Sequence, residues 1–247
     1  MKTIAFNMQF YSENGKIMII GKMATYPKRE KELRQAVMSV LPQVDKLIIC
    51  LNEYKTIPAW LTGEKRIESI IPKRDLKDLG KFITVDHDYS YCVYFDDDIL
   101  YPPDYVETII TGLNNSATSS VVSFHGSIYS PPVFSFNPKK LKAYLGFRLK
   151  LSNPEWYRRV YPFHQKLETK KWVEQVGTGV LALRKEHEPP LKYMENSIKF
   201  VDVRFSKWCF ENKIKMVCLE RPANWIREQS VTESIASSFT PNAPRNV

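Results

Sequence analysis

Three consecutive carboxylates, Asp96, Asp97 and Asp98, are the side chains with the clearest potential for chemistry in this sequence. They follow an apolar and aromatic run at residues 91–95, which predicts a buried strand that ends at the carboxylates. Adjacent acids at a strand end repel one another and resist desolvation, and a cation relieves both effects. Divalent cations such as Mg²⁺ and Mn²⁺ take oxygen ligands and often bridge protein carboxylates to phosphates. The run therefore predicts a metal site, in a chain whose formal net charge is +9.

The extended segment also predicts where each of these acids points. Side chains alternate between the two sides of a strand, so we expect Asp96 and Asp98 to share one metal ion while Asp97 contacts another group. Because neutralisation relieves the crowding of charge, changing Asp96 or Asp98 to Asn is expected to leave stability unimpaired. A solvated acidic turn is the alternative interpretation, since most runs of acids are turns of that kind.

Asp202 is another acidic side chain in a position suited to chemistry. It precedes residues 203–212, whose pattern predicts a helix, so it is a good candidate for a helix N-cap, which contributes about 1 kcal/mol. A positioned carboxylate can also act as a general base that takes a proton from a hydroxyl group. On the residues alone, both interpretations of Asp202 remain open.

Two other segments offer polar groups to a ligand. Thr178 lies between Gly177 and Gly179, and glycines allow the backbone to approach a ligand closely, although a simple bulge explains this pair equally well. His125 follows a predicted strand at residues 119–124, and a histidine in such a place is more often structural than a substrate contact. Thr178 and His125 are candidates for binding the acceptor of a transferred group.

Lys81 is a candidate for binding phosphate. It follows Gly80 at the end of the charged segment 72–82, whose composition favours a surface loop with a short helix. The segment nevertheless joins the predicted metal strand by a short connection, and an ammonium group there can neutralise a phosphate as a point charge.

The elements around these residues predict the α/β class. A strand at residues 16–23, an amphipathic helix and a strand at residues 46–51 form the pattern of a βαβ unit. Such units build parallel strands in a sheet that is covered on both faces. Ligands of open α/β sheets bind beyond the carboxyl ends of the strands, where the loop 24–29, Asn52 and the three aspartates would meet.

The segment at residues 129–172 has a different character. It contains five prolines and many aromatic and basic residues, and we expect it to be irregular. Long irregular segments are usually functional or mobile. It is either a lid that binds an acceptor substrate or a long insertion that packs against the rest of the domain.

The bulk composition limits the classes of protein. A hydrophobic content of 43% suits an ordered globular protein, and no apolar run approaches the roughly 20 residues that span a bilayer. The first 15 residues show no signal peptide, so a cytoplasmic location is expected. The four cysteines form no CxxC pair and are expected to be buried thiols. The basic excess suits nucleic acid, an anionic membrane or phosphorylated small molecules, and nucleic acid ranks last because no binding motif is present.

The order of these features resembles bacterial glycosyltransferases of the GT-A fold, which use nucleotide sugars, carry a DXD motif and build surface polysaccharides. The resemblance covers roughly residues 16–219, and the three-carboxylate motif is its most specific part. It implies a Rossmann-type sandwich with a mostly parallel central sheet flanked by helices. We expect one domain at residues 1–247, with a donor-binding half near 16–115, an acceptor-binding half near 116–229 and a flexible tail at 230–247.

The resemblance also implies roles for matching positions. Asp96 and Asp98 would hold a divalent cation, Mn²⁺ or Mg²⁺, and Asp202 would be the general base of an inverting reaction. Many members supply a further metal ligand, often His, late in the chain, and here no His follows His187. Donor-binding roles fall on Ala24, Thr25, Tyr26, Arg29, Asn52, Asp78, Lys81 and Asp97.

The expected function is transfer of a sugar from a nucleotide-sugar donor, a UDP-sugar first, to a hydroxyl of a glycan or lipid-linked acceptor. Peripheral contact with the inner membrane surface or with other glycan-assembly enzymes is a further expectation. The alternatives are a metal-dependent phosphotransferase or nucleotidyltransferase, which also place DxD at a strand end, and a non-catalytic carbohydrate- or membrane-binding module.

Overall fold

The computed structural model describes residues 11–12, 15–16, 18–149, 151, 157–195, 197–198 and 200–229. The flexible tail expected at residues 230–247 lies outside the described residues.

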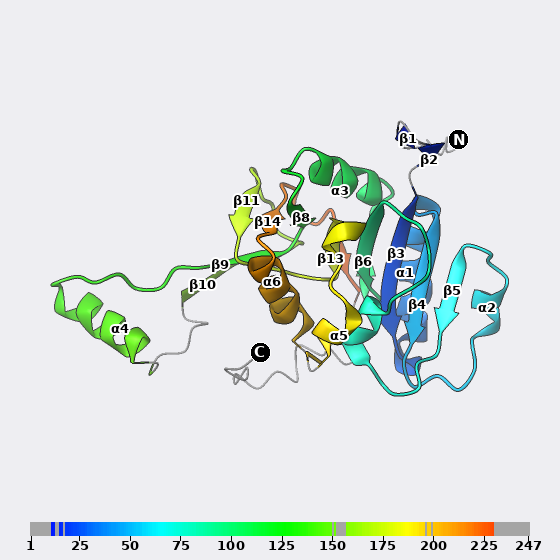
Figure 1. Ribbon diagram of the computed structural model, residues 1–247, viewed down its shortest axis with the longest axis horizontal. Coiled ribbons are helices and arrows are strands. Elements are labelled where there is room, and N and C mark those ends of the chain that lie inside the picture. The colour runs from blue at the N-terminus through cyan, green and yellow to red at the C-terminus, as the bar shows by residue number, and fades with distance from the viewer. Residues whose placement is uncertain are drawn as a thin grey trace.

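A mostly parallel sheet forms the centre of the protein (Figure 1). Within the described residues it has eight strands in the order β11-β14-β8-β13-β6-β3-β4-β5. β13 runs antiparallel to β6 and β8, and β11 runs antiparallel to β14, while the other neighbours are parallel. The predicted α/β class is therefore confirmed. The strands are β3 (Ile19–Thr25), β4 (Lys46–Leu51), β5 (Ile67–Ile70), β6 (Tyr91–Asp96), β8 (Ser120–Ser123), β11 (Lys171–Val173), β13 (Val180–Arg184) and β14 (Lys215–Cys218).

Helices α1 (Glu30–Val40) and α3 (Tyr105–Asn114) cover one face of the sheet. Their apolar sides pack in one buried cluster with Val93 and Phe95 of β6. The 3-10 helices η1 (Pro27–Arg29) and η2 (Leu41–Gln43) flank α1. Pro27 disfavours a helix at the residue before it, and Pro42 cannot continue the helix, so the two prolines lie just outside the ends of α1.

The other face is covered by α6 (Val201–Glu211) and the 3-10 helix η3 (Lys77–Phe82). Cys92 and Tyr94, which alternate with Val93 and Phe95 along β6, pack in the second buried cluster. Burial on both faces explains why β6 reads as a continuous apolar run rather than an alternating one.

A smaller sheet joins β9 (Gly126–Tyr129), β10 (Arg158–Tyr161) and β12 (Gln175–Val176). The connection between β9 and β10 contains helix α4 (Pro138–Arg148), so the expectation that residues 129–172 are irregular is wrong. Asn137 caps this helix by accepting hydrogen bonds from the backbone N–H groups of Lys139 and Lys140. The helix has no buried residue, and it therefore lacks the apolar stripe by which sequence periodicity detects a helix.

Short elements complete the described chain, and none of its helices has the length and apolar character needed to cross a bilayer. Cys50, Cys92, Cys209 and Cys218 are free and buried, as the sequence predicted. The short elements are β1 (Tyr11–Ser12), β2 (Gly15–Lys16), α2 (Ala59–Thr62), β7 (Ile99–Leu100), η5 (Lys185–His187), α5 (Leu191–Met194) and β15 (Arg227–Glu228).

Candidate active site

The carboxyl ends of β3, β4 and β6 meet at one edge of the sheet. Ala24 of β3 lies opposite Asp96 of β6, and Thr25 lies opposite Leu51 of β4. The backbone N–H of Asn52 donates to the carbonyl of Thr25 at 2.9 Å. The structure thus brings the first loop, Asn52 and the aspartates to a common edge, as expected for a parallel sheet.

Lys81 lies at the centre of this edge. The Lys81 side chain is only 5% exposed, and its ammonium group donates a hydrogen bond to the carboxylate of Asp96. Burial lowers the pKa of Lys81, but the attraction of Asp96, Asp202 and Asp78 outweighs it and raises the pKa above its usual value. Lys81 therefore remains a cation, and it links the aspartate run electrostatically to Asp202.

The η3 segment that carries Lys81 is fixed by Asn52. The side chain of Asn52 accepts from the N–H of Leu76 and donates to the carbonyl of Lys77, each at 2.9 Å. Gly80 lies so close to β4 that a Cβ there would be 2.6 Å from the sulfur of Cys50. In this structure Asn52 therefore supports the loop that presents Lys81.

Arg29 joins the other two aspartates. Its guanidinium donates to Asp97 at 2.7 Å and to Asp98 at 2.8 Å, and its carbon atom Cζ lies 5.5 Å from the centre of the Tyr26 ring. The expectation that Asp97 faces away from Asp98 is wrong, because β6 ends at Asp96 and the chain turns there. Alternation of side chains applies only while the backbone stays extended.

Crowding of like charge persists despite these cations. Burial and then repulsion by Asp96 raise the pKa of Asp98 to about 6, although Arg29 opposes the shift. Burial also raises the pKa of Asp97, again against the attraction of Arg29. A net excess of negative charge therefore remains between Asp96 and Asp98.

The donor set of Asp96 and Asp98 fits Mg²⁺ or Mn²⁺ bound together with substrate phosphates. Protein sites of this kind use only one or two carboxylates, and the phosphates and water complete the shell. Within the described residues no group of three or more His, Cys, Asp or Glu side chains is arranged to hold a metal by itself. Any ion here would therefore complete its shell with oxygen atoms of the substrate and of water.

Asp202 lies in the first turn of α6, and Phe200 rather than Asp202 is the N-cap. The N-cap interpretation of Asp202 is therefore wrong. One carboxylate oxygen, Oδ1, accepts from the N–H of Thr178 at 2.8 Å and from its hydroxyl at 2.6 Å. These two bonds orient the carboxylate, and within the described chain no hydrogen bond is made to its other oxygen, Oδ2.

Gly179 and Tyr101 link Asp96 to the segment that binds Asp202, and neither residue was assigned to the site from the sequence. The hydroxyl of Tyr101 donates to the carbonyl of Gly179 at 2.6 Å and accepts from the N–H of Asp96 at 2.8 Å. A Cβ on Gly179 would lie 1.9 Å from a carboxylate oxygen of Asp96. The Gly-Thr-Gly pattern contained this signal, since a glycine permits such an approach.

Substitution of Gly179 tests this close approach. Gly179→Ala should displace the Asp96 carboxylate or the strand, and overpacking of this kind costs about 1–3 kcal/mol. Gly63→Ala is the matched control, because a Cβ at Gly63 meets nothing within 4 Å. Denaturant unfolding should show a lower midpoint for Gly179→Ala alone, and equal midpoints would mean that Asp96 moves aside freely.

His125 borders the Asp202 side of the site. A Cβ on Gly177 would lie 3.0 Å from the Cβ of His125, so the two residues are in close contact. Burial lowers the pKa of His125, and Asp202 opposes that shift. His125 and Thr178, the two candidates for acceptor binding, thus both lie near Asp202.

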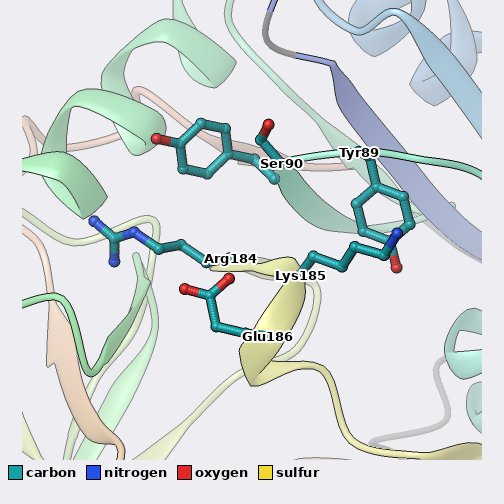
Figure 2. Close-up of a pocket in the computed structure, with 6 residues that line it drawn as sticks. Tyr89, Ser90, Arg184, Lys185 and Glu186 are labelled. Carbon is teal, nitrogen blue, oxygen red and sulfur yellow. The ribbon is translucent and has the colours of Figure 1, made fainter. Parts of the chain in front are cut away.

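A shallow pocket of about 440 Å³ opens at the opposite edge of the sheet (Figure 2). Its residue Tyr91 begins β6, whereas Asp96 ends that strand. Lys185 extends over the Tyr89 ring, with its nitrogen 4.8 Å from the ring centre. The pocket is separate from the aspartates, and its lining is Tyr89, Ser90, Tyr91, Arg184, Lys185 and Glu186.

The fold and this edge define an α/β protein with a charged site at the carboxyl ends of its parallel strands. The fold is similar to that of S. aureus TarS 1-349 in complex with UDP-GlcNAc, with a TM-score of 0.53, 11% identity, and coverage of 91% of this chain and 62% of that chain. A second structure of TarS 1-349 matches with a TM-score of 0.50, 11% identity, and coverage of 84% and 59%. The chain thus spans less than two thirds of either structure, and no family model or curated protein matches it.

Proposed function

We propose that this protein is a metal-dependent glycosyltransferase that moves a sugar from a nucleotide-sugar donor to a hydroxyl of a glycan or lipid-linked acceptor. The observation that carries the proposal is the convergence of Lys81, Asp96 and Asp202 at the carboxyl edge of the sheet. The similar fold of TarS, solved with UDP-GlcNAc, supports a UDP-sugar as the donor. The proposed role is in the synthesis of surface polysaccharide in the cytoplasm, because the order of motifs along the chain resembles that of bacterial glycosyltransferases with this role.

The donor would lie along the edge formed by the first loop and η3. Asp96 and Asp98 would hold a divalent cation, which would stabilise the charge that develops on a departing nucleoside diphosphate. Lys81 is a buried cation, and it is well placed to add positive charge for the same phosphates. Ala24, Thr25, Tyr26 and Asp78 would border the nucleoside.

Asp202 would act on the acceptor. Thr178 holds one carboxylate oxygen by two hydrogen bonds, so the other oxygen can accept the proton of a hydroxyl group that attacks the anomeric carbon. A single displacement assisted by such a base inverts the anomeric configuration. His125 and Thr178 are the residues beside this carboxylate that could orient the acceptor.

Lys81 and Lys77 form a matched pair for testing the phosphate contact. Lys81→Ala should weaken the binding of a UDP-sugar by about tenfold or more, as expected for loss of a charged hydrogen bond. Lys77→Ala should have little effect, because its side chain is 47% exposed and pairs with Asp75. Isothermal titration with both variants is the measurement, and equal losses would show that general basicity rather than a defined contact matters.

A panel of nucleotide sugars, read by thermal shift with and without Mn²⁺, tests the proposal as a whole. A rise in melting temperature that needs both a nucleotide sugar and Mn²⁺ is the expected result. Hydrolysis of a phosphate monoester without a nucleotide sugar would favour the phosphotransferase alternative. Full binding of a ligand by Asp96→Asn/Asp98→Asn would favour a non-catalytic binding module.

A further inference from the structure

An arm at residues 130–149, here called the α4 arm, projects from the strands β9 and β10. Antiparallel pairing of these strands, with Tyr129 opposite Arg158, forms its base. The arm contains α4, which lies away from the central sheet at the left of Figure 1 and has no buried residue. The packing of the core therefore does not explain the side chains that the arm presents.

The α4 arm exposes large apolar side chains. Phe136 is 89% exposed and Leu149 is 66% exposed. Single exposed apolar side chains are common, but a group of them gathered on one element marks an interaction surface. The ring of Phe134 contacts the rings of Phe136 and Tyr144, with centroids 5.2 and 5.7 Å away, so the aromatic residues form one group. Leu145, four residues before Leu149, lies on the same side of the helix and is also exposed.

The charge of the α4 arm has a single sign. Residues 130–149 contain no Asp or Glu, whereas they carry Lys139, Lys140, Lys142 and Arg148. The chain as a whole mixes the two signs, with 27 acidic and 36 basic residues. The arm therefore combines apolar and basic side chains and has no acidic one. Such a surface complements a partner with negative charges on its outside and an apolar layer beneath them.

We propose that the α4 arm docks this protein on an anionic lipid bilayer. Aromatic and aliphatic side chains would enter the interface while the lysines pair with the anionic headgroups. A second copy of the chain is a poorer partner, because two arms of the same charge repel each other. Nucleic acid is also poorer, because bases could stack on the aromatic rings but would leave the exposed Leu145 and Leu149 without a contact.

The base of the α4 arm adjoins the candidate active site. β9 begins at Gly126, next to His125, and it pairs with β12, which leads to Thr178. Docking of the arm would therefore bring the acceptor side of the site near the bilayer. This consequence for a lipid-linked acceptor rests on the proposed function, but binding of the arm to lipid does not.

Sedimentation with vesicles tests the docking. The protein should bind vesicles of equal parts phosphatidylglycerol and phosphatidylcholine, bind weakly to phosphatidylcholine alone, and dissociate as salt rises. The variant Lys139→Gln/Lys140→Gln/Lys142→Gln should bind on the order of a hundredfold more weakly, from about fivefold per lysine. The control Lys31→Gln/Lys65→Gln/Lys207→Gln changes the net charge equally at exposed sites elsewhere and should bind almost as the parent does.

A second pair of variants separates apolar insertion from charge. Phe136→Ser/Leu149→Ser should weaken binding at least about tenfold, while Met38→Ser/Phe210→Ser, at positions 76% and 81% exposed, should not. All variants should melt as the parent does, because the changed side chains are exposed. Equal losses in the variants and their controls would overturn the proposal. So would self-association that needs Phe136 and Leu149 without lipid, or tighter binding to a single-stranded oligonucleotide than to vesicles.

Discussion

Asp202→Asn is expected to lower turnover by about 10²- to 10⁴-fold, the usual share of a positioned acid–base group. The affinity for the donor should stay nearly unchanged, because the donor would be held by β3, β4, η3 and β6. The fold should also persist, since the amide oxygen of Asn can accept both hydrogen bonds from Thr178. Steady-state kinetics combined with donor titration separates these effects.

Glu107→Gln is the control for this change. Glu107 is an exposed acid in the first turn of α3, as Asp202 is an acid in the first turn of α6, so both changes remove a charge that favours a helix start. Only the Asp202 variant should lose turnover. Near-normal turnover in Asp202→Asn, or a product that retains the anomeric configuration, would leave Asp202 as a residue that positions Thr178.

Asp96→Asn and Asp98→Asn are each expected to abolish measurable transfer. A cation that stabilises a leaving diphosphate contributes several kcal/mol, so its loss corresponds to about 10³-fold or more in rate. The shift of melting temperature caused by Mn²⁺ with donor should disappear in the same variants. Full activity of either variant at ordinary concentrations of metal would contradict the metal assignment.

The structure separates the effects of these two changes on stability. Asp98→Asn should melt no lower than the parent, because burial disfavours its charge and Arg29 keeps Asp97 as a partner. Asp96→Asn should melt lower, because it removes the hydrogen-bonded anion from the buried Lys81. This revises the expectation from the sequence, in which neutralising either aspartate left stability unimpaired. Thermal unfolding without metal distinguishes the two cases.

The elements of the first half of the chain could be predicted because burial on two faces leaves a strong pattern. Continuous apolar runs gave β4 with its observed bounds and β6 to within one residue of its end. The antiparallel direction of β13 could not be predicted, because the apolar residues of a buried strand do not record its direction. Helix α4 was missed because its side chains are exposed rather than turned to the core.

Within the candidate site, residue types were easier to predict than their partners. The sequence placed Lys81 near the aspartates, and the structure pairs it with Asp96. The bonding of Arg29 to Asp97 and Asp98 depends on how the chain turns after β6, which local sequence does not determine. Tyr101 was missed because its role arises from two backbone groups that are far apart in the sequence, those of Asp96 and Gly179, and no side-chain motif reports such a contact.

Calorimetric titration of UDP-GlcNAc in the presence of Mn²⁺ is the most direct test of the central claim, which is that a nucleotide sugar binds at the edge containing Lys81 and Asp96. The parent protein should bind at one site, and UDP should compete while a phosphate monoester should not. Asp96→Asn and Lys81→Ala should each weaken this binding, whereas Lys185→Ala, in the pocket at the opposite edge, should leave it unchanged. Failure of every nucleotide sugar to bind, or binding that Lys185→Ala removes and Lys81→Ala leaves intact, would contradict the account.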